Sequence, residues 1–231
     1  MKKIIIFVAL LLLGIVAYFF QGPVSASVDC VGQTATIVGT DGDDVIVGTD
    51  GNDVIAGLGG NDIISGGKGD DLICGGVGND TLYGEDGKDH LVSMMGEPGN
   101  DTLYGGNDND NLLGGDGNDT LFGENGNDIL AGRGGNDTLY GGNNNDNLDG
   151  NEGLDTLYGE TGNDIVQGGA GDFDPATTNE DTINGGEGND TLTAGPEFGG
   201  DGTGTDICDG GQGAGDSLTD PSNCSSVVNI P

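Results

Sequence analysis

Residues 114–122 read Gly-Gly-Asp-Gly-Asn-Asp-Thr-Leu-Phe, and residues 75–83 read Gly-Gly-Val-Gly-Asn-Asp-Thr-Leu-Tyr. Units of this kind follow one another along most of the 231-residue chain. Positions 1 and 4 of the unit are nearly always Gly, position 6 is Asp and position 8 is aliphatic. A unit this short cannot bury its aliphatic side chain alone, so the repeat predicts units that stack around a continuous core.

The Asp at position 6 marks the period of the array. It recurs every nine residues, apart from an insertion that we place at Ser93, Met94 and Met95. In two units position 4 is not Gly but Asp108 or Asn144. Asn and Asp are the non-Gly residues that best tolerate a left-handed backbone, so position 4 is predicted to lie in a tight turn with positive φ.

A second period of eighteen residues is superimposed on the first. Between Thr81 and Tyr158, every second unit has an aromatic residue at position 9 and Thr at position 7, as in Thr102 and Tyr104. Alternate units should therefore lie on different faces, and the insertion keeps this phase. No apolar pattern of helical period follows Phe20. The sequence predicts an all-β, two-sheet solenoid with two very short parallel strands in each 18-residue coil.

The charge of the chain is strongly one-sided. It has 40 Asp and Glu against 5 Lys and Arg, a formal net charge of -35 at pH 7. Carboxylates at this density repel one another unless cations lie between them. The same charge makes nucleic acid and anionic membrane surfaces poor partners. An acidic, Gly-rich chain is typical of disorder, so we expect the chain to be disordered without metal and folded with it.

The units quoted above resemble the RTX, or haemolysin-type, calcium-binding nonapeptide repeat, over about residues 39–218. The resemblance implies a parallel β-roll with Ca²⁺ in rows between stacked turns. It implies as ligands main-chain carbonyls and the position-6 carboxylates. These carboxylates belong to Asp44, Asp53, Asp62, Asp71, Asp80, Asp89, Asp101, Asp110, Asp119, Asp128, Asp137, Asp146, Asp155, Asp164, Asp181 and Asp190. The units after residue 168 are irregular, so the expectation weakens beyond Asp190.

The chemistry of these residues agrees with calcium. Ca²⁺ takes six to eight oxygen ligands and mixes carboxylates with carbonyls, whereas Mg²⁺ demands a smaller octahedron. No cluster of His and Cys suits zinc. The alternative is that each Asp only closes its turn by hydrogen bonding. That alternative does not explain why position 6 keeps a carboxylate while Asn is frequent at position 5.

The first 26 residues differ from the rest. Lys2 and Lys3 precede an apolar run from Ile4 to Phe20, and Val24-Ser25-Ala26 provides small residues for cleavage before Ser27. Residues 1–26 are therefore predicted to be a signal peptide or, if uncleaved, an N-terminal membrane anchor. Both alternatives predict a secreted, extracellular protein or one attached to the cell surface.

The remaining chain divides by regularity. We expect an N-terminal cap at 27–38, regular repeats at 39–167, irregular repeats at 168–219 and a C-terminal cap or tail at 220–231. Four Cys in an exported chain suggest two disulfides, and three pairings are open. Pairing by nearness gives Cys30–Cys74 and Cys208–Cys224, which would hold the two ends of the stack.

Catalysis finds little support, and the expected role is not enzymatic. The single His90 occupies an ordinary position 7, and no Gly-x-Ser-x-Gly motif is present. The first candidate function is a calcium-stabilised structural, adhesive or surface-associated module. The second is binding of a cell-surface polymer or glycan by the exposed Thr/Tyr ladder. A secreted hydrolase is the remote third.

Overall fold

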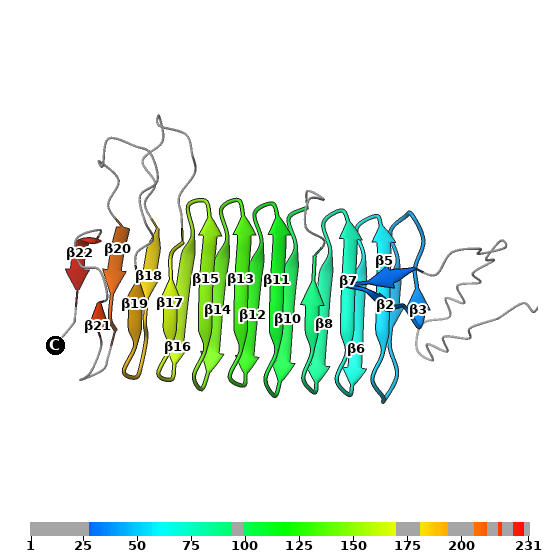
Figure 1. Ribbon diagram of the computed structural model, residues 1–231, viewed down its shortest axis with the longest axis horizontal. Coiled ribbons are helices and arrows are strands. Elements are labelled where there is room, and N and C mark those ends of the chain that lie inside the picture. Colours follow the sequence, from blue (N-terminus) through cyan, green and yellow to red (C-terminus); the bar gives the residue numbers. More distant parts are fainter. Residues whose placement is uncertain are drawn as a thin grey trace, which may run out of the picture.

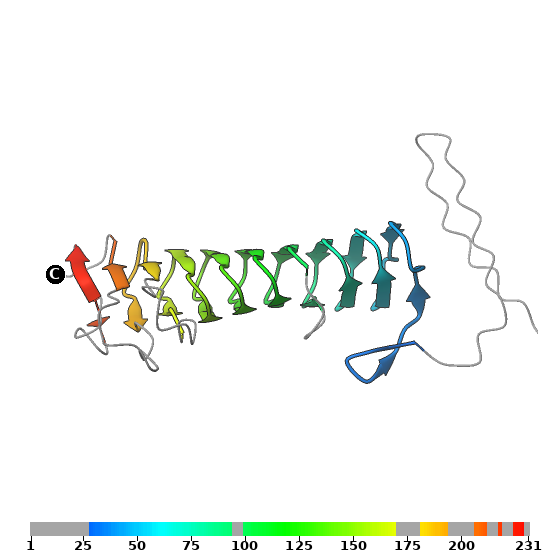
Figure 2. The same ribbon diagram turned by 90° about the horizontal axis from the view of Figure 1, so that it is seen from above.

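The computed structural model describes residues 28–93, 99–169, 181–193, 206–211, 217–218 and 224–228. Over these residues the chain winds into a solenoid whose coils stack along one axis (Figure 1). Each coil contributes one strand to each of two facing sheets, as the view along the sheet edges shows (Figure 2). The predicted all-β, two-sheet parallel solenoid is confirmed.

Two ten-stranded sheets, one of even-numbered and one of odd-numbered strands, account for most of the described residues. The even-numbered sheet contains β4 (Val45–Val47), β6 (Ile63–Lys68), β8 (Thr81–Asp86), β10 (Thr102–Asn107), β12 (Thr120–Asn125), β14 (Thr138–Asn143), β16 (Thr156–Thr161), β18 (Thr182–Asn184), β20 (Asp206–Asp209) and β22 (Cys224–Val228). The odd-numbered sheet contains β3 (Ile37–Val38), β5 (Val54–Gly59), β7 (Leu72–Val77), β9 (His90–Val92), β11 (Asn111–Asp116), β13 (Ile129–Gly134), β15 (Asn147–Glu152), β17 (Ile165–Gln167), β19 (Thr191–Thr193) and β21 (Ser217–Leu218).

The strands of the regular coils are longer than predicted. They run over six residues, from position 7 of one unit to position 3 of the next, as in β10 and β12. The Gly-rich positions are part of the parallel ladder, because Gly106 pairs with Glu124 and Asn107 with Asn125. The turns of the regular coils are correspondingly short and comprise positions 4 to 6, as at residues 108–110 between β10 and β11.

The aliphatic side chains at position 8 form one continuous core between the sheets. Leu103, Leu121 and Leu139 are stacked in register on consecutive even-numbered strands and are 0 % exposed. Their counterparts on the odd-numbered strands, such as Leu112 and Leu130, are equally buried. Burying one such side chain contributes about 1.5–3 kcal/mol, so the core is built in equal increments along the stack.

The paired residues show how the chain accommodates its irregular segments. Paired residues are 18 apart in the regular coils, and this separation increases where the chain passes through 94–98 and through 170–180. Ser93 lies inside the stack, because its N–H donates to the carbonyl of Leu113 as the N–H of Gly48 does to that of Ser65. Ser93 therefore occupies position 1 of its unit, and its assignment to the insertion was wrong.

Positive φ occurs at two positions of the turn. At position 4, Asp108 (φ 79°) and Asn144 (φ 80°) are left-handed like most of the Gly residues there, as predicted. Gly42 and Gly51 are outside this region, so the prediction was wrong for the first two turns. Position 2 is also left-handed, which the sequence did not lead us to expect. Its non-Gly members are Leu58, Glu85, Glu124, Arg133, Asn151 and Glu160.

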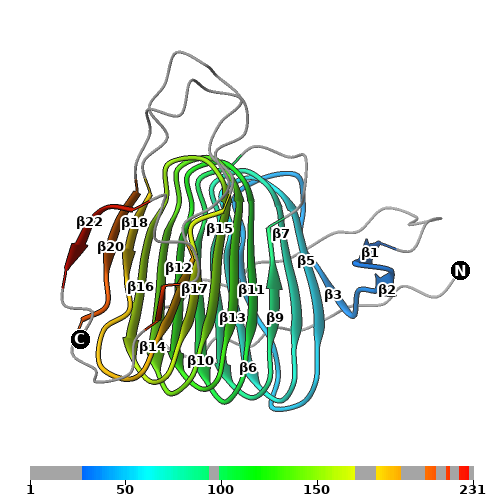
Figure 3. The same ribbon diagram turned by 60° about the vertical axis from the view of Figure 1, so that its left-hand side comes forward.

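An antiparallel hairpin of β1 (Asp29–Cys30) and β2 (Gln33–Thr34) precedes the solenoid (Figure 3). The strand β1 lies against β5 and β7. Cys30 and Cys74 form a disulfide with a Cα–Cα distance of 5.8 Å, so this predicted pairing is confirmed. Both cysteines pack with Leu72 and Val92 in a second apolar cluster. The disulfide therefore fixes the hairpin on the outer surface of the odd-numbered sheet, two strands in from its end.

The other two cysteines lie near the C-terminal end. Cys208, on β20, is buried and disulfide-bonded. The side chain of Cys224 lies outside the described residues, so the pairing Cys208–Cys224 stays a prediction. The segment 1–26 is also outside them. In the part of the chain that the structure describes, no helix is long and apolar enough to span a membrane.

Removal of the Cys30–Cys74 crosslink is expected to weaken the solenoid. Joint Cys30→Ser and Cys74→Ser substitution should lower the free energy of unfolding by about 2–4 kcal/mol, because the bond restricts a long loop of the unfolded chain. The residues it joins are 44 apart in sequence. Urea unfolding at saturating calcium measures the change. An unchanged free energy of unfolding would contradict the expectation.

Candidate metal centre

The position-6 Asp residues form two rows, one along each edge of the solenoid where turns lead into strands. Each Asp directly precedes a strand, so stacking of the coils places equivalent carboxylates above one another. One row contains Asp44, Asp62, Asp80, Asp101, Asp119, Asp137, Asp155 and Asp181. The other contains Asp53, Asp71, Asp89, Asp110, Asp128, Asp146, Asp164 and Asp190.

Within each row, one carboxylate oxygen ties neighbouring coils together. The N–H of Asp101 donates to Oδ1 of Asp119 at 2.8 Å, and the N–H of Asp119 donates to Oδ1 of Asp137 at 2.8 Å. The same contact reaches from Asp155 to Asp181 across the irregular segment, at 2.9 Å. The rows therefore continue past the regular repeats, as far as Asp181 and Asp190.

The second carboxylate oxygen, Oδ2, is buried without a hydrogen-bond partner in most of these residues. The Asp side chains concerned are 1–3 % exposed. They are Asp62, Asp71, Asp80, Asp89, Asp110, Asp119, Asp128, Asp137, Asp146, Asp155 and Asp164. A buried charged oxygen without a partner costs several kcal/mol, so one such atom per turn requires a compensating cation or proton.

Main-chain oxygens lie close to these unpartnered atoms. A Cβ added to Gly57, at position 1, would lie 2.4 Å from Oδ2 of Asp62 and 2.4 Å from the carbonyl oxygen of Gly75. At Gly150 the corresponding distances to Asp155 Oδ2 and the Gly168 carbonyl are both 2.3 Å. Gly at position 1 thus leaves room where a carboxylate oxygen and a carbonyl oxygen converge.

This set of oxygens fits calcium better than other metals. No group of three His, Cys, Asp or Glu side chains in the described residues could hold a metal ion by itself. Any ion would therefore have to be completed by main-chain carbonyls, a combination that Ca²⁺ accepts readily. All of the converging donors are oxygens, and zinc prefers nitrogen and sulfur. The residues that would hold calcium are the position-6 Asp residues with an unpartnered Oδ2, together with main-chain carbonyls of the Gly-rich positions.

Burial makes the metal-free carboxylates weak acids. Desolvation raises the pKa of Asp110 and Asp146 to about 8, and the repulsion of neighbouring carboxylates adds to the shift. The pKa of Asp155 is likewise raised to about 8 by burial. In all three, a hydrogen bond from the main chain of the preceding coil works in the opposite direction. Without metal, protons compete for the same oxygens at neutral pH.

Position 5 carries a separate ladder that the sequence did not reveal. The N–H of Asn118 donates to Oδ1 of Asn100, and that of Asn136 to Oδ1 of Asn118, both at 2.7 Å. These amides are exposed and need only one acceptor oxygen, so Asn is sufficient. Hydrogen bonding closes the turns at both positions, but it does not account for the buried, unpartnered Oδ2 at position 6. This favours metal binding over the alternative in which each Asp only closes its turn.

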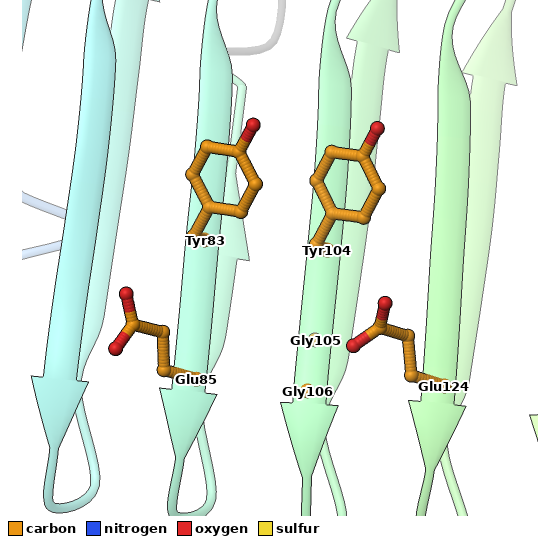
Figure 4. Close-up of a pocket in the computed structure, with 6 residues that line it drawn as sticks. All are labelled: Tyr83, Glu85, Tyr104, Gly105, Gly106 and Glu124. Atoms are coloured by element: carbon orange, nitrogen blue, oxygen red, sulfur yellow. The ribbon is translucent and has the colours of Figure 1, made fainter.

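The aromatic residues at position 9 stack on the outer face of the even-numbered sheet. Ring centroids of Tyr83 and Tyr104 are 4.9 Å apart with an interplanar angle of 5°. The ladder continues through Phe122, Tyr140 and Tyr158 at similar spacing. In Figure 4 the first two rings lie side by side, above the carboxylates of Glu85 and Glu124. These residues line a shallow hollow of about 330 Å³ over the Gly105 and Gly106 backbone.

Two stacked parallel sheets with Gly-rich turns and buried carboxylate rows define a parallel β-roll. The model of the RTX calcium-binding nonapeptide repeat matches residues 38–73, 75–94, 93–121, 104–139, 113–148, 122–157, 140–172 and 176–196. The chain belongs to this family, whose repeats are calcium-binding motifs. No curated protein sequence matches the chain.

Proposed function

We propose that the protein is an extracellular calcium-binding β-roll that folds on calcium and acts as a structural, adhesive or surface-associated module. The observation that carries the proposal is the series of buried Oδ2 atoms without partners. Each such atom destabilises the metal-free fold, and each would gain a partner when Ca²⁺ binds. The ligands in this proposal are the position-6 Asp residues whose Oδ2 is buried without a partner, and main-chain carbonyls beside them.

An extracellular location is supported by two features. The disulfide Cys30–Cys74 is of the kind that persists in oxidising compartments. The sequence of residues 1–26 has the features of an export segment, with Lys2 and Lys3 before an apolar run. Extracellular calcium is abundant, so weak sites with Kd of order 10⁻⁴ to 10⁻³ M are sufficient there.

The polymer-binding alternative gains no specific support from the aromatic ladder. Aromatic side chains commonly bind sugars through their ring faces. Here the faces of Tyr104, Phe122 and Tyr140 are stacked on one another, which leaves edges and hydroxyl groups for a ligand. Cross-strand aromatic pairs of this kind stabilise a sheet, and that role accounts for the ladder.

A calcium titration followed by far-UV circular dichroism tests the proposal. In excess chelator the chain is expected to lose its β signal, because the carboxylate rows then repel and stay unpartnered. Added calcium should restore the signal cooperatively, with a midpoint of order 10⁻⁴ to 10⁻³ M. Magnesium at the same concentration is the control and should not restore it. A β signal unchanged by chelator would overturn the proposal.

A further inference from the structure

Between Asp44 and Asp164, three of the position-6 carboxylates have a hydroxyl partner on Oδ2, and the others have no hydrogen-bond partner there. The hydroxyl of Thr40 donates to Oδ2 of Asp44 at 2.9 Å, and the Thr40 N–H donates to the same oxygen at 2.6 Å. Thr49 makes the same two contacts with Asp53, at 2.9 and 2.7 Å. The hydroxyl of Ser93 donates to Oδ2 of Asp101. In all three turns the oxygen that is unpartnered elsewhere already has a donor.

The local sequence explains why these turns differ. Thr40 and Thr49 occupy position 2, where the other described residues of the regular units have positive φ and leave Oδ2 of the following Asp without a partner. In the Thr turns, the N–H at position 4 donates to the Thr hydroxyl oxygen, at 3.3 Å for Gly42 and 3.2 Å for Gly51. Neither of these two Gly residues adopts the left-handed conformation found at most position-4 residues. The Thr side chain thus replaces the left-handed turn by one held through hydrogen bonds of its own.

Ser93 reaches the same result from position 1. All other described residues at this position in the regular units are Gly, and their added Cβ would crowd the Asp carboxylate of the same unit. Ser93 is 1 % exposed and has its hydroxyl directed at Asp101. Burial raises the pKa of Asp101, and the hydrogen bonds from the Asp80 main chain and from Ser93 oppose that rise by stabilising the anion.

We propose that Asp44, Asp53 and Asp101 hold no calcium, and that hydroxyl groups take the place of the ion in their turns. An O–H or N–H directed at Oδ2 supplies a hydrogen bond, and with it a partial positive charge, to the oxygen that a cation contacts elsewhere. The calcium rows then begin at Asp62 and Asp71, and between Asp62 and Asp155 the first row is interrupted once, at Asp101. This inference rests on the proposed calcium-dependent fold and specifies which of its turns use the metal.

The position of the Thr turns suggests their purpose. They belong to the first coil, which has a neighbouring coil on one side only, next to the hairpin that Cys30–Cys74 fixes to the solenoid. In these turns the Thr hydroxyl and N–H provide the hydrogen-bond partners of the buried carboxylate. The first coil can therefore cap the metal-dependent coils without binding an ion itself.

The matched variants Asp101→Asn and Asp119→Asn test the inference, because the two residues are consecutive members of one row. In Asp101→Asn the Ser93 hydroxyl can reverse its role and accept a hydrogen bond from the new amide. The number of bound calcium ions, measured by equilibrium dialysis at saturation, should stay that of the wild type. Asp119→Asn places an amide at an oxygen proposed to bind calcium, so it should lose at least one ion. The calcium concentration at the midpoint of its folding should rise roughly tenfold.

A variant expected to bind more calcium than the wild type provides a second test of the inference. Ser93→Gly removes the hydroxyl and restores the residue found at position 1 of the other units, so one additional calcium ion is expected. Equal loss of calcium in Asp101→Asn and Asp119→Asn, or no gain in Ser93→Gly, would overturn the inference. Both outcomes differ from failure of the proposed function, in which the wild-type chain binds no calcium at all.

Discussion

Gly132→Ala is expected to abolish folding at calcium concentrations that fold the wild type, whereas Gly134→Ala on the same strand, β13, is expected to have little effect. A Cβ on Gly132 would lie 2.2 Å from Oδ2 of Asp137 and 2.8 Å from the carbonyl oxygen of Gly150. A Cβ on Gly134 would have its nearest neighbour 3.6 Å away, which is ordinary van der Waals contact. Neither Gly has positive φ, so the comparison isolates the space at position 1.

The crowding at Gly132 cannot be relieved cheaply. Asp137 is 1 % exposed and its Oδ1 accepts the N–H of Asp119 at 2.8 Å, so the carboxylate cannot swing away without breaking the bond between coils. Overpacking of this kind costs about 1–3 kcal/mol, and displacement of Oδ2 also removes a proposed calcium ligand. The calcium midpoint of folding should therefore rise by at least about tenfold, which corresponds to about 1.4 kcal/mol.

Calcium titrations of the two variants, monitored by far-UV circular dichroism, measure the difference. Gly134→Ala carries the same added methyl group and the same change in backbone entropy, so it corrects for both. Equal midpoints for the two variants would contradict the proposal that position 1 is kept open for the oxygens of the turn.

Much of this fold could be predicted from the sequence because one unit determines it. The aliphatic residue at position 8, and the aromatic residue at alternate position 9 from Tyr83 to Tyr158, define the two sheets and their 18-residue register. The hairpin β1–β2 could not be predicted, because its docking depends on which outward-facing side chains are apolar. Ala56, Cys74 and Val92 at position 9 of the odd-numbered strands carry that signal, and it becomes clear only when the hairpin is seen beside them.

The candidate site shows the same division. The Asp residues at position 6 were identifiable from their period alone, and the structure brings them together in two rows. The different roles of Oδ1 and Oδ2 could not be identified from the sequence, because they depend on contacts between residues one coil apart. The exceptional turns at Thr40, Thr49 and Ser93 were visible as departures from the repeat. Their meaning required the position of each hydroxyl relative to the carboxylate.

Acid is expected to stabilise the metal-free chain and to weaken its calcium-bound form. An exposed Asp has a pKa of about 3.9, as it would in the unfolded chain. In the metal-free fold, burial raises the pKa of Asp71 to about 6, that of Asp119 to about 7 and that of Asp110 to about 8. A carboxyl with a raised pKa contributes its stability in the protonated form. That contribution is complete below about pH 4 and is lost as the pH rises through 6 to 8.

The metal-free protein should therefore have its largest β signal near pH 4 and lose it toward pH 8. Each carboxyl that loses its proton on unfolding contributes up to about 1.4 kcal/mol per pH unit. In calcium the dependence reverses, because Ca²⁺ and protons compete for the same oxygens and the metal is favoured at high pH. The calcium midpoint of folding should rise as the pH is lowered from 8 to 5.

Circular dichroism measures the pH dependence of both forms between pH 4 and 8. The metal-free form is recorded in buffer freed of calcium by chelating resin, and the calcium-bound form after calcium is restored. Exposed acids also repel one another more as they ionise, and matched variants separate that contribution. Asp146→Asn removes a buried carboxyl whose pKa is raised to about 8, and its amide oxygen can still accept the Asp128 N–H. Asp116→Asn removes an exposed carboxyl and the same unit of charge. Only Asp146→Asn should flatten the metal-free slope. Equal slopes in the two variants would attribute the pH dependence to surface repulsion and not to the buried rows.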